Sequence, residues 1–265
     1  MIRAVWAAHG TAEAAVLPGL VAPDSHIEFI FHLGSPWRMK RLGVPEWAQQ
    51  PTAFIYGQNR RCLQFAGTGE VSLVALRVSP VVAATLLGRS LSDLWDQPVP
   101  LEDLIGTEAS ELLDRLRIAA DADRFSILRQ WVGKRLSGWD ADCRYAQQLF
   151  DEVLWRRHHG TMPEIANALG PSGRSLRRIF ANHAGLSPKE VQLSGRLLTA
   201  CALLHERHEL NVTDIADQTG FYDHAAFTHA FANRVGVGPI QFREEPLVFY
   251  ERRGHDLQAE THAPR

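Results

Sequence analysis

Three arginines lie close together in the second half of the chain, at Arg174, Arg177 and Arg178. A guanidinium group can donate two parallel hydrogen bonds to the O6 and N7 atoms of guanine, or to a phosphate. Residues 171–181 contain no acidic side chain, so this charge is not neutralised locally. We expect Arg174 and Arg177 to contact bases and Arg178 to contact a base or a phosphate. A solvated charged face is the alternative.

The arginines belong to a segment that recurs later in the chain. Ile165–Gly170 resembles Ile215–Gly220 at an offset of 50 residues, which becomes 51 after the turn. The pairs matched at the second offset are Ser172/Asp223, Leu176/Phe227, Phe180/Phe231, Gly185/Gly236 and Pro188/Pro239. Each copy predicts a short helix, a tight glycine turn and a second, capped helix. This order is typical of a helix-turn-helix, whose second helix can enter the major groove of DNA.

The second helix of each copy carries the residues that could read bases. In the first copy, Gly173 precedes the arginines. The second copy offers His224, Ala225, Thr228 and His229 instead. Ala225 and Thr228 can contact a thymine methyl group, and the histidines can donate hydrogen bonds to bases or phosphates. Because this copy is poor in charge, a unit that mostly positions the protein on DNA without reading its sequence is nearly as good an interpretation.

Helix N-termini are expected to contact phosphates, because their unpaired backbone N–H groups favour an anion. The expected starts lie near Thr161, Ser187, Thr213 and Asp223. Lys189 adds a positive charge close to the second of these starts. Arg196 is expected to bridge the two copies structurally, with a phosphate contact as the alternative.

A long helix is predicted between the two copies. Ser187 can cap it, Pro188 suits its first turn, and apolar residues recur at helical spacing until about Arg207. A helix of about 20 residues spans roughly 30 Å, close to the ~34 Å of one turn of DNA. Such a helix would hold the two reading helices in successive major grooves.

Residues from about Asp142 to Arg243 resemble the DNA-binding domain of AraC/XylS-type transcriptional regulators. The matching stretches are IANALGPSGRSLRRIFANHAGLSPKEV, GRLLTACALL and VTDIADQTGFYDHAAFTHAFANRVGVGPIQFR. The resemblance implies two helix-turn-helix units that read promoter DNA in a sequence-specific manner, with activation or repression left open. It leaves RNA polymerase, a small-molecule effector and a second copy of the chain as further candidate partners. Gly238 departs from the pattern, since a serine usually precedes this proline, as Ser187 does in the first copy.

The first 80 residues read as short strands separated by Gly and Pro. His26–Leu33 alternates between two faces, and Ala53–Tyr56, Cys62–Ala66 and Val71–Val78 are further strand-like runs. Helices are predicted over 80–136. This half resembles a cupin-like regulatory domain found in some members of the same family. The resemblance implies a sensor or dimerisation module, without a ligand to transfer.

One predicted strand face carries His26, Glu28 and His32, which, together with Trp37, are candidates for binding an effector. Three further aromatic residues, Trp6, Tyr56 and Phe65, could line the same pocket. Along a strand, His32 would lie about 13 Å from Glu28, too far for one metal ion to bind both. No metal site is therefore predicted, and polar residues on a barrel surface are the alternative.

The predicted fold class is α+β with two domains: a β-rich cupin-like domain with flanking helices over 1–140, and an all-α domain of two helix-turn-helix units joined by a long helix over 141–245. Residues 246–265 are predicted to be a polar tail. The formal charge of −2 predicts modest non-specific affinity for DNA.

Several classes of protein are not expected from this sequence. We expect no cofactor and no enzyme, since no GxSxG, Walker, GxGxxG or HExxH motif occurs. A cupin-like enzyme or a metal or ligand sensor fused to a DNA-binding domain is the alternative function. Three separated cysteines, the absence of a long apolar run and an N-terminus unlike a signal peptide predict a cytoplasmic protein without a membrane span.

Overall fold

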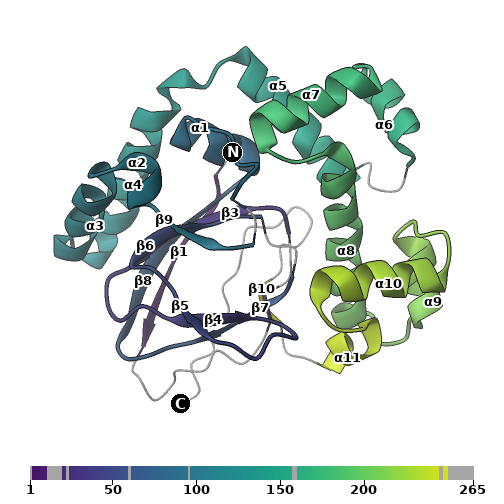
Figure 1. The fold of residues 1–265 in the computed structure, drawn as a ribbon, viewed down its shortest axis with the longest axis horizontal. Coiled ribbons are helices and arrows are strands. Elements are labelled where there is room, and N and C mark those ends of the chain that lie inside the picture. Colours follow the sequence, from purple (N-terminus) through teal and green to yellow (C-terminus); the bar gives the residue numbers. More distant parts are fainter. Residues whose placement is uncertain are drawn as a thin grey trace.

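The computed structural model describes residues 2–10, 20–21, 24–58, 61–94, 96–156, 160–244 and 247–249. A β-rich part with covering helices is followed by a helical part (Figure 1). This is the α+β architecture predicted from the sequence. Most of the predicted tail, including 250–265, lies outside the described residues.

Two five-stranded sheets face each other in the β-rich part (Figure 1). The first has the order β1 (Ile2–Gly10), β8 (Val71–Val78), β3 (Ile27–His32), β6 (Ala53–Tyr56) and β9 (Pro98–Pro100), with antiparallel neighbours. The second has the order β10 (Leu247–Phe249), β2 (Leu20–Val21), β7 (Leu63–Ala66), β4 (Arg38–Arg41) and β5 (Ala48–Gln49). Strand β10 pairs in parallel with β2, so the chain returns to the β-rich part after the helices.

The alternation predicted for β3 is observed. Ile27, Phe29 and Phe31 belong to the core that lies beneath the helices, whereas Ile30 belongs to the cluster between the two sheets. The helices over the first core are α1 (Pro80–Leu87), α2 (Glu102–Ile105), α3 (Glu108–Ile118) and α4 (Asp121–Arg135). Since successive side chains of a strand point to opposite faces, β3 contributes to both cores at once.

The helical part contains two units arranged along one long helix. Its helices are α5 (Ala141–Asp151), α6 (Met162–Leu169), α7 (Gly173–Ala184), α8 (Pro188–Glu206), α9 (Val212–Gln218), α10 (His224–Val235) and α11 (Pro239–Glu244), with a π-helical turn at Glu152–Arg156. In Figure 1, α6 and α7 lie near one end of α8, and α9, α10 and α11 surround its other end. The long connecting helix predicted to begin after Ser187 and end near Arg207 is confirmed.

The helix boundaries follow from local hydrogen bonds. The side chains of Ser172 and Asp223 accept hydrogen bonds from the backbone of Ser175 and Ala226, as expected of N-caps. Gly170 and Gly220 have φ angles of 95° and 74°, which a residue without Cβ adopts at little cost. Because these signals are short in range, both helix-turn-helix units were predictable from the sequence.

Candidate nucleic-acid interface

The first helix-turn-helix unit consists of α6 and α7. Ile165, Leu176 and Phe180 are buried in one core with residues of α5 and α8. Residues four apart lie on the same helix face, so burial of Leu176 and Phe180 turns the neighbouring positions outward. The predicted base-reading residues Gly173, Arg174, Arg177 and Arg178 are all exposed.

The charge on α7 is available to a ligand. None of its three arginines forms an ion pair with a residue that the structure describes. The first turn of α7 contains no acidic residue, and its cap is the neutral Ser172. This arrangement favours binding of an anion, because the helix dipole and the guanidinium groups act in the same direction.

The second unit, α9 and α10, presents a different surface. Phe227 and Phe231 are fully buried, whereas His224, Ala225 and His229 are exposed. His229 makes a hydrogen bond with the side chain of Asn233. The exposed surface of α10 therefore carries little charge, as the sequence indicated.

Thr228 is less accessible than its neighbours on α10. It is half-buried, and its hydroxyl oxygen is enclosed without a hydrogen-bond partner among the described residues. Of its two functional groups, only the methyl group remains for the predicted contact with thymine. That contact stays a prediction.

Three of the helix N-termini predicted to contact phosphate already hold a carboxylate. Thr161 and Ser187 form capping boxes in which Glu164 and Glu190 accept hydrogen bonds from the capping backbone. The hydrogen bonds from Thr161 lower the pKa of Glu164, which keeps its negative charge in place. A phosphate at either helix would meet this negative charge, which disfavours the predicted contacts.

The third of these helices begins earlier than the expected start near Thr213. Asn211 caps α9 in a box with Asp214, so exposed Thr213 lies within the first turn. The side chain of Asn211 accepts from the Asp214 N–H at 2.9 Å, which fixes the start at this position. Lys189 is exposed in the first turn of α8, where it remains a phosphate candidate.

Arg196 lies in α8 with its guanidinium over the ring of Phe221, 5.6 Å from the ring centroid. Burial lowers the pKa of this guanidinium from its usual value. Phe221 follows α9, so the contact joins the long helix to the second unit. This geometry favours the structural role expected for Arg196 over a phosphate contact.

Sequence reasoning missed Tyr222, which directly precedes the cap of α10. Its side chain is 96% exposed, which is unusual for an aromatic residue of this size. An exposed ring beside the start of a recognition helix is a further candidate contact for DNA. The signal in the sequence was a large aromatic residue at the cap-preceding position, where the first copy has the small Pro171.

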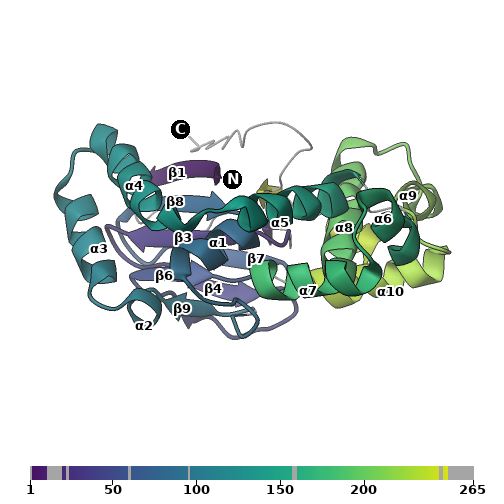
Figure 2. The ribbon, with the colours of Figure 1, turned by 90° about the horizontal axis from the view of Figure 1, so that it is seen from above.

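The β-rich part contacts the C-terminal ends of both recognition helices. Gln58 donates a hydrogen bond from Nε2 to the carbonyl oxygen of Ala184 at the end of α7, over 2.7 Å. The backbone N–H of Cys62 donates to the carbonyl of Val235 at the end of α10, over 3.2 Å. Figure 2 shows α1, α5 and α7 close together, and α1 contacts both α5 and α7. The two recognition helices are thus supported from the same neighbouring part of the chain.

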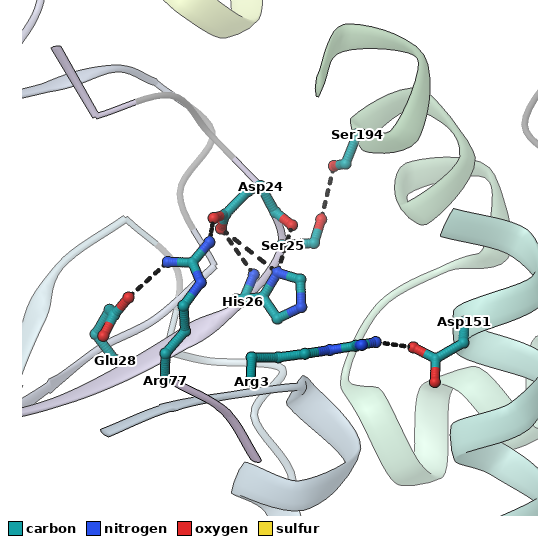
Figure 3. Close-up of polar contacts among 8 residues, drawn as sticks. All are labelled: Arg3, Asp24, Ser25, His26, Glu28, Arg77, Asp151 and Ser194. Carbon is teal, nitrogen blue, oxygen red and sulfur yellow. Dashed lines mark hydrogen bonds and ion pairs between the residues drawn. The ribbon is translucent and has the colours of Figure 1, made fainter. Parts of the chain in front are cut away.

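A cavity of about 60 Å³ lies between the two sheets. Trp6, Trp37, Tyr56 and Phe65 line it, as expected of the pocket. The polar residues that line it include Asp24, His26, Glu28 and Arg77, shown in Figure 3. Arg77 forms ion pairs with both carboxylates, Asp24 and Glu28.

His32, also predicted to bind an effector, is not among the residues that line this cavity. It is fully buried, and its Nε2 atom makes a hydrogen bond of 2.8 Å with Gln50. Its ring stacks on Phe54 at 6.0 Å. Burial lowers the pKa of the imidazole. The strand alternation placed His32 on the correct face, but Trp37 and Gln50 pack around it.

No group of three or more residues that could hold a metal ion occurs among the described residues. Within the same part of the chain, no helix has the length and apolar character needed to cross a membrane.

Two family models match the chain. A helix-turn-helix domain family matches residues 165–245, which begin in α6 and include both recognition helices. A domain of unknown function, DUF6597, matches residues 1–100. Residues 101–164 lie between the two matches.

Curated relatives are similar over the helical part. The probable transcription factor PqrA of Proteus vulgaris is 38% identical over 94 residues, which cover 35% of this chain and 76% of that protein. The Msm operon regulatory protein of Streptococcus mutans is 38% identical over 82 residues, or 31% of this chain and 29% of its own length. The chain thus matches less than a third of the length of the Msm operon regulatory protein.

Solved structures show a more distant similarity. ToxT from Vibrio cholerae has a TM-score of 0.40 and 14% identity, covering 90% of this chain and 95% of that one. The C-terminal domain of AraT from Geobacillus stearothermophilus has a TM-score of 0.34 and 24% identity. This match covers 43% of this chain and 92% of the AraT domain. The match to most of PqrA, together with the helix-turn-helix family model, identifies the chain as a member of the AraC/XylS-type family of DNA-binding transcriptional regulators.

Proposed function

We propose that this regulator reads double-stranded promoter DNA in a sequence-specific manner, with α7 as the principal reading helix. The observation that carries the proposal is the exposed face of α7. It presents Arg174, Arg177 and Arg178 without an ion-pair partner among the described residues, while its opposite face is buried. Arginine pairs with guanine through two hydrogen bonds, which provides discrimination as well as affinity.

In this proposal α10 is a second, weaker reader. Its exposed His224, Ala225 and His229 offer methyl contacts and single hydrogen bonds. The carboxylate of Asp223 at its N-terminus accepts a hydrogen bond from Ala226 at 2.6 Å and would repel a phosphate there. We therefore assign most of the sequence preference to the half-site that α7 contacts.

Selection of bound sequences from random duplex DNA, using the full chain, tests this function. We expect two enriched half-sites whose centres lie about one helical turn, or roughly 10 base pairs, apart. Affinity for the selected duplex should fall steeply as salt concentration rises, since phosphate contacts release counterions. Recovery of no common sequence, with equal binding to all duplexes, would overturn sequence-specific reading.

A second proposal is that a small molecule in the cavity controls DNA binding. The segment Asp24–His26 supports it, because Asp24 and His26 line the cavity while Ser25 contacts α8. We propose RNA polymerase and a second copy of the chain as further partners. We also propose that the chain divides near residue 140 into a regulatory domain and a DNA-binding domain. Turnover of a substrate by the full chain would instead favour the cupin-like enzyme.

A further inference from the structure

Tyr222 lies between α9 and α10, directly before the residue that caps the second recognition helix. It is 96% exposed, although a tyrosine in a folded protein is usually at least partly buried. A side chain this exposed contributes little to packing, so the fold itself does not account for a large aromatic residue here. Residues 223–226, which follow it, are also exposed and continue the same surface onto α10.

The turn that carries Tyr222 is held on both sides. Before it, the ring of Phe221 packs edge-on against Phe227 in α10, with 5.2 Å between the ring centroids. After it, the carboxylate of Asp223 accepts a hydrogen bond from the Ala226 N–H at 2.6 Å. Because both neighbours are fixed, the backbone of Tyr222 is already ordered, which lowers the entropy that its contact with a partner would cost.

The position of Tyr222 relative to α10 places it beside the wall of the groove that this helix would enter. A recognition helix contacts base edges with its N-terminal residues, and a residue that precedes the cap lies just outside them. The opposite end of α10 contacts the β-rich part through Val235, so the start of the helix points away from that part (Figure 1). The sugar–phosphate backbone forms the walls of the groove and is therefore the part of DNA nearest to Tyr222.

The usual phosphate contact at the start of a helix is disfavoured in α10. Backbone N–H groups there attract an anion, but the carboxylate of Asp223 already accepts from one of them and carries a negative charge. The next three residues, His-Ala-Ala at 224–226, add no permanent positive charge. A hydroxyl just outside the cap can donate to a phosphate without competing with Asp223 for the backbone N–H groups.

We propose that the hydroxyl of Tyr222 donates a hydrogen bond to a DNA phosphate beside the half-site of α10, with its ring against the adjoining sugar. This contact positions α10 on the duplex and reads no base. The assignment rests on the proposed DNA-reading function and deepens it. The first unit has Pro171 at the matched position, where the three exposed arginines of α7 supply the charge instead.

A base contact fits Tyr222 less well than a phosphate contact. A phenol hydroxyl has one donor, whereas the strongest base discrimination in the major groove comes from side chains that make two hydrogen bonds to one base. Insertion of a ring between base pairs is typical of proteins that bend DNA from the minor groove, and a recognition helix enters the major groove. A protein partner is a separate possibility, for which changes at Tyr222 would leave DNA binding as it is.

Fluorescence anisotropy with the full chain and the selected duplex tests the assignment. We expect Tyr222→Phe, which removes only the hydroxyl, to raise Kd about two- to tenfold. Tyr222→Ala should raise Kd further, because the ring is lost as well. Both variants should keep the base preference of the parent chain, since loss of a phosphate contact weakens binding uniformly across sequences. Tyr145→Phe, at a 42% exposed position of α5, is the matched control and should leave Kd unchanged.

Methylphosphonate substitution in the duplex identifies the phosphate. Scanned along the half-site of α10, it should reveal one position that weakens the parent chain more than it weakens Tyr222→Phe. A Kd for Tyr222→Phe equal to that of the parent chain, or equal losses at every scanned position, would overturn the phosphate contact. A changed base preference in Tyr222→Ala would overturn it in favour of base reading.

The same comparison separates this inference from the proposed function. If the parent chain selects no common sequence, sequence-specific reading fails. Phosphates occur in every duplex, so the Kd values of the parent chain and Tyr222→Phe on random DNA still decide whether the hydroxyl contacts the backbone. If the parent chain selects a sequence and Tyr222→Phe binds it equally well, only the assignment of Tyr222 fails.

Discussion

The side chain of Gln58 donates a hydrogen bond of 2.7 Å to the carbonyl oxygen of Ala184, the last residue of α7. Gln58 is 2% exposed and lies in the β-rich part. The last carbonyl groups of a helix have no partner within the helix, so this bond satisfies one of them from a distant segment. The helix that carries the three exposed arginines is thus held at its C-terminal end by the β-rich part.

Gly185→Ala is predicted to weaken this contact. Gly185 follows α7 with a φ of 64°, and an added Cβ would lie 2.8 Å from the backbone nitrogen of Ser92. Gly88 has the same φ of 64° after α1, but nothing lies within 4 Å of its added Cβ. Both changes should lower the free energy of unfolding by about 1–2 kcal/mol, because alanine disfavours the left-handed conformation. Only Gly185→Ala adds a steric clash, between the new Cβ and the backbone of Ser92.

Urea unfolding and limited proteolysis of the two glycine variants distinguish these costs. We expect Gly185→Ala to lose more stability than Gly88→Ala and to be cleaved faster between the β-rich part and α7. Equal losses in both variants would mean that the contact at Ser92 adjusts freely.

Arg174→Ala is predicted to weaken specific DNA binding by roughly 1–3 kcal/mol, or about 5–150-fold in Kd. The loss should be accompanied by a relaxed preference at one base pair, since the side chain is exposed in the first turn of α7, after the neutral Ser172 cap. Arg129→Ala, at an exposed position of α4, is the matched control. Fluorescence anisotropy with the selected duplex measures both, and an unchanged Kd and base preference would remove Arg174 from the interface.

Arg77→Met is predicted to destabilise the chain by about 3–5 kcal/mol, because two largely buried carboxylates lose their counterion. The matched control is Arg89→Met. Arg89 pairs with Asp93 at 2.6 Å, but the two side chains are 40% and 62% exposed, so the cost should stay below about 1 kcal/mol. Denaturant titration measures both, and similar losses would show that the Arg77 pairs contribute no more than a surface pair.

Acidification is predicted to destabilise the fold through His32. Burial lowers the pKa of this imidazole below the usual 6.5, and Nδ1 has no hydrogen-bond partner among the described residues. Below pH 6.5 the unfolded chain therefore binds a proton that the folded chain does not, so the free energy of unfolding falls with pH by at most ~1.4 kcal/mol per unit for this group.

His32→Gln should flatten this pH dependence. Burial also lowers the pKa of His205, so the variant keeps part of the slope. Thermal or urea unfolding between pH 7 and pH 5 measures the difference. Parallel profiles for the parent chain and the variant would assign the slope to other groups.

The sequence by itself determined the two helix-turn-helix units. Their caps at Ser172 and Asp223 and their buried pairs, such as Phe227 and Phe231, involve residues at most four positions apart. The spacing of residue types along the chain predicts such short-range interactions directly. The alternation that places Ile30 and Phe31 on opposite faces of β3 has the same local origin.

Strands without a strong local pattern were not predictable. β1 is rich in alanine and pairs with β8, and β4 is a short charged strand, RMKR. Their conformation depends on partners that are distant in the sequence, because β-propensity is decided largely by the neighbouring strands.

Only the tertiary structure decided how the two parts meet. It placed Gln58 against Ala184, Ser25 against Ser194, and Arg77 between two carboxylates. It also enclosed His32 while leaving Glu28 at the cavity. Each of these contacts joins segments whose separation no periodicity specifies, since the packing of whole sheets and helices, rather than residue spacing, brings them together.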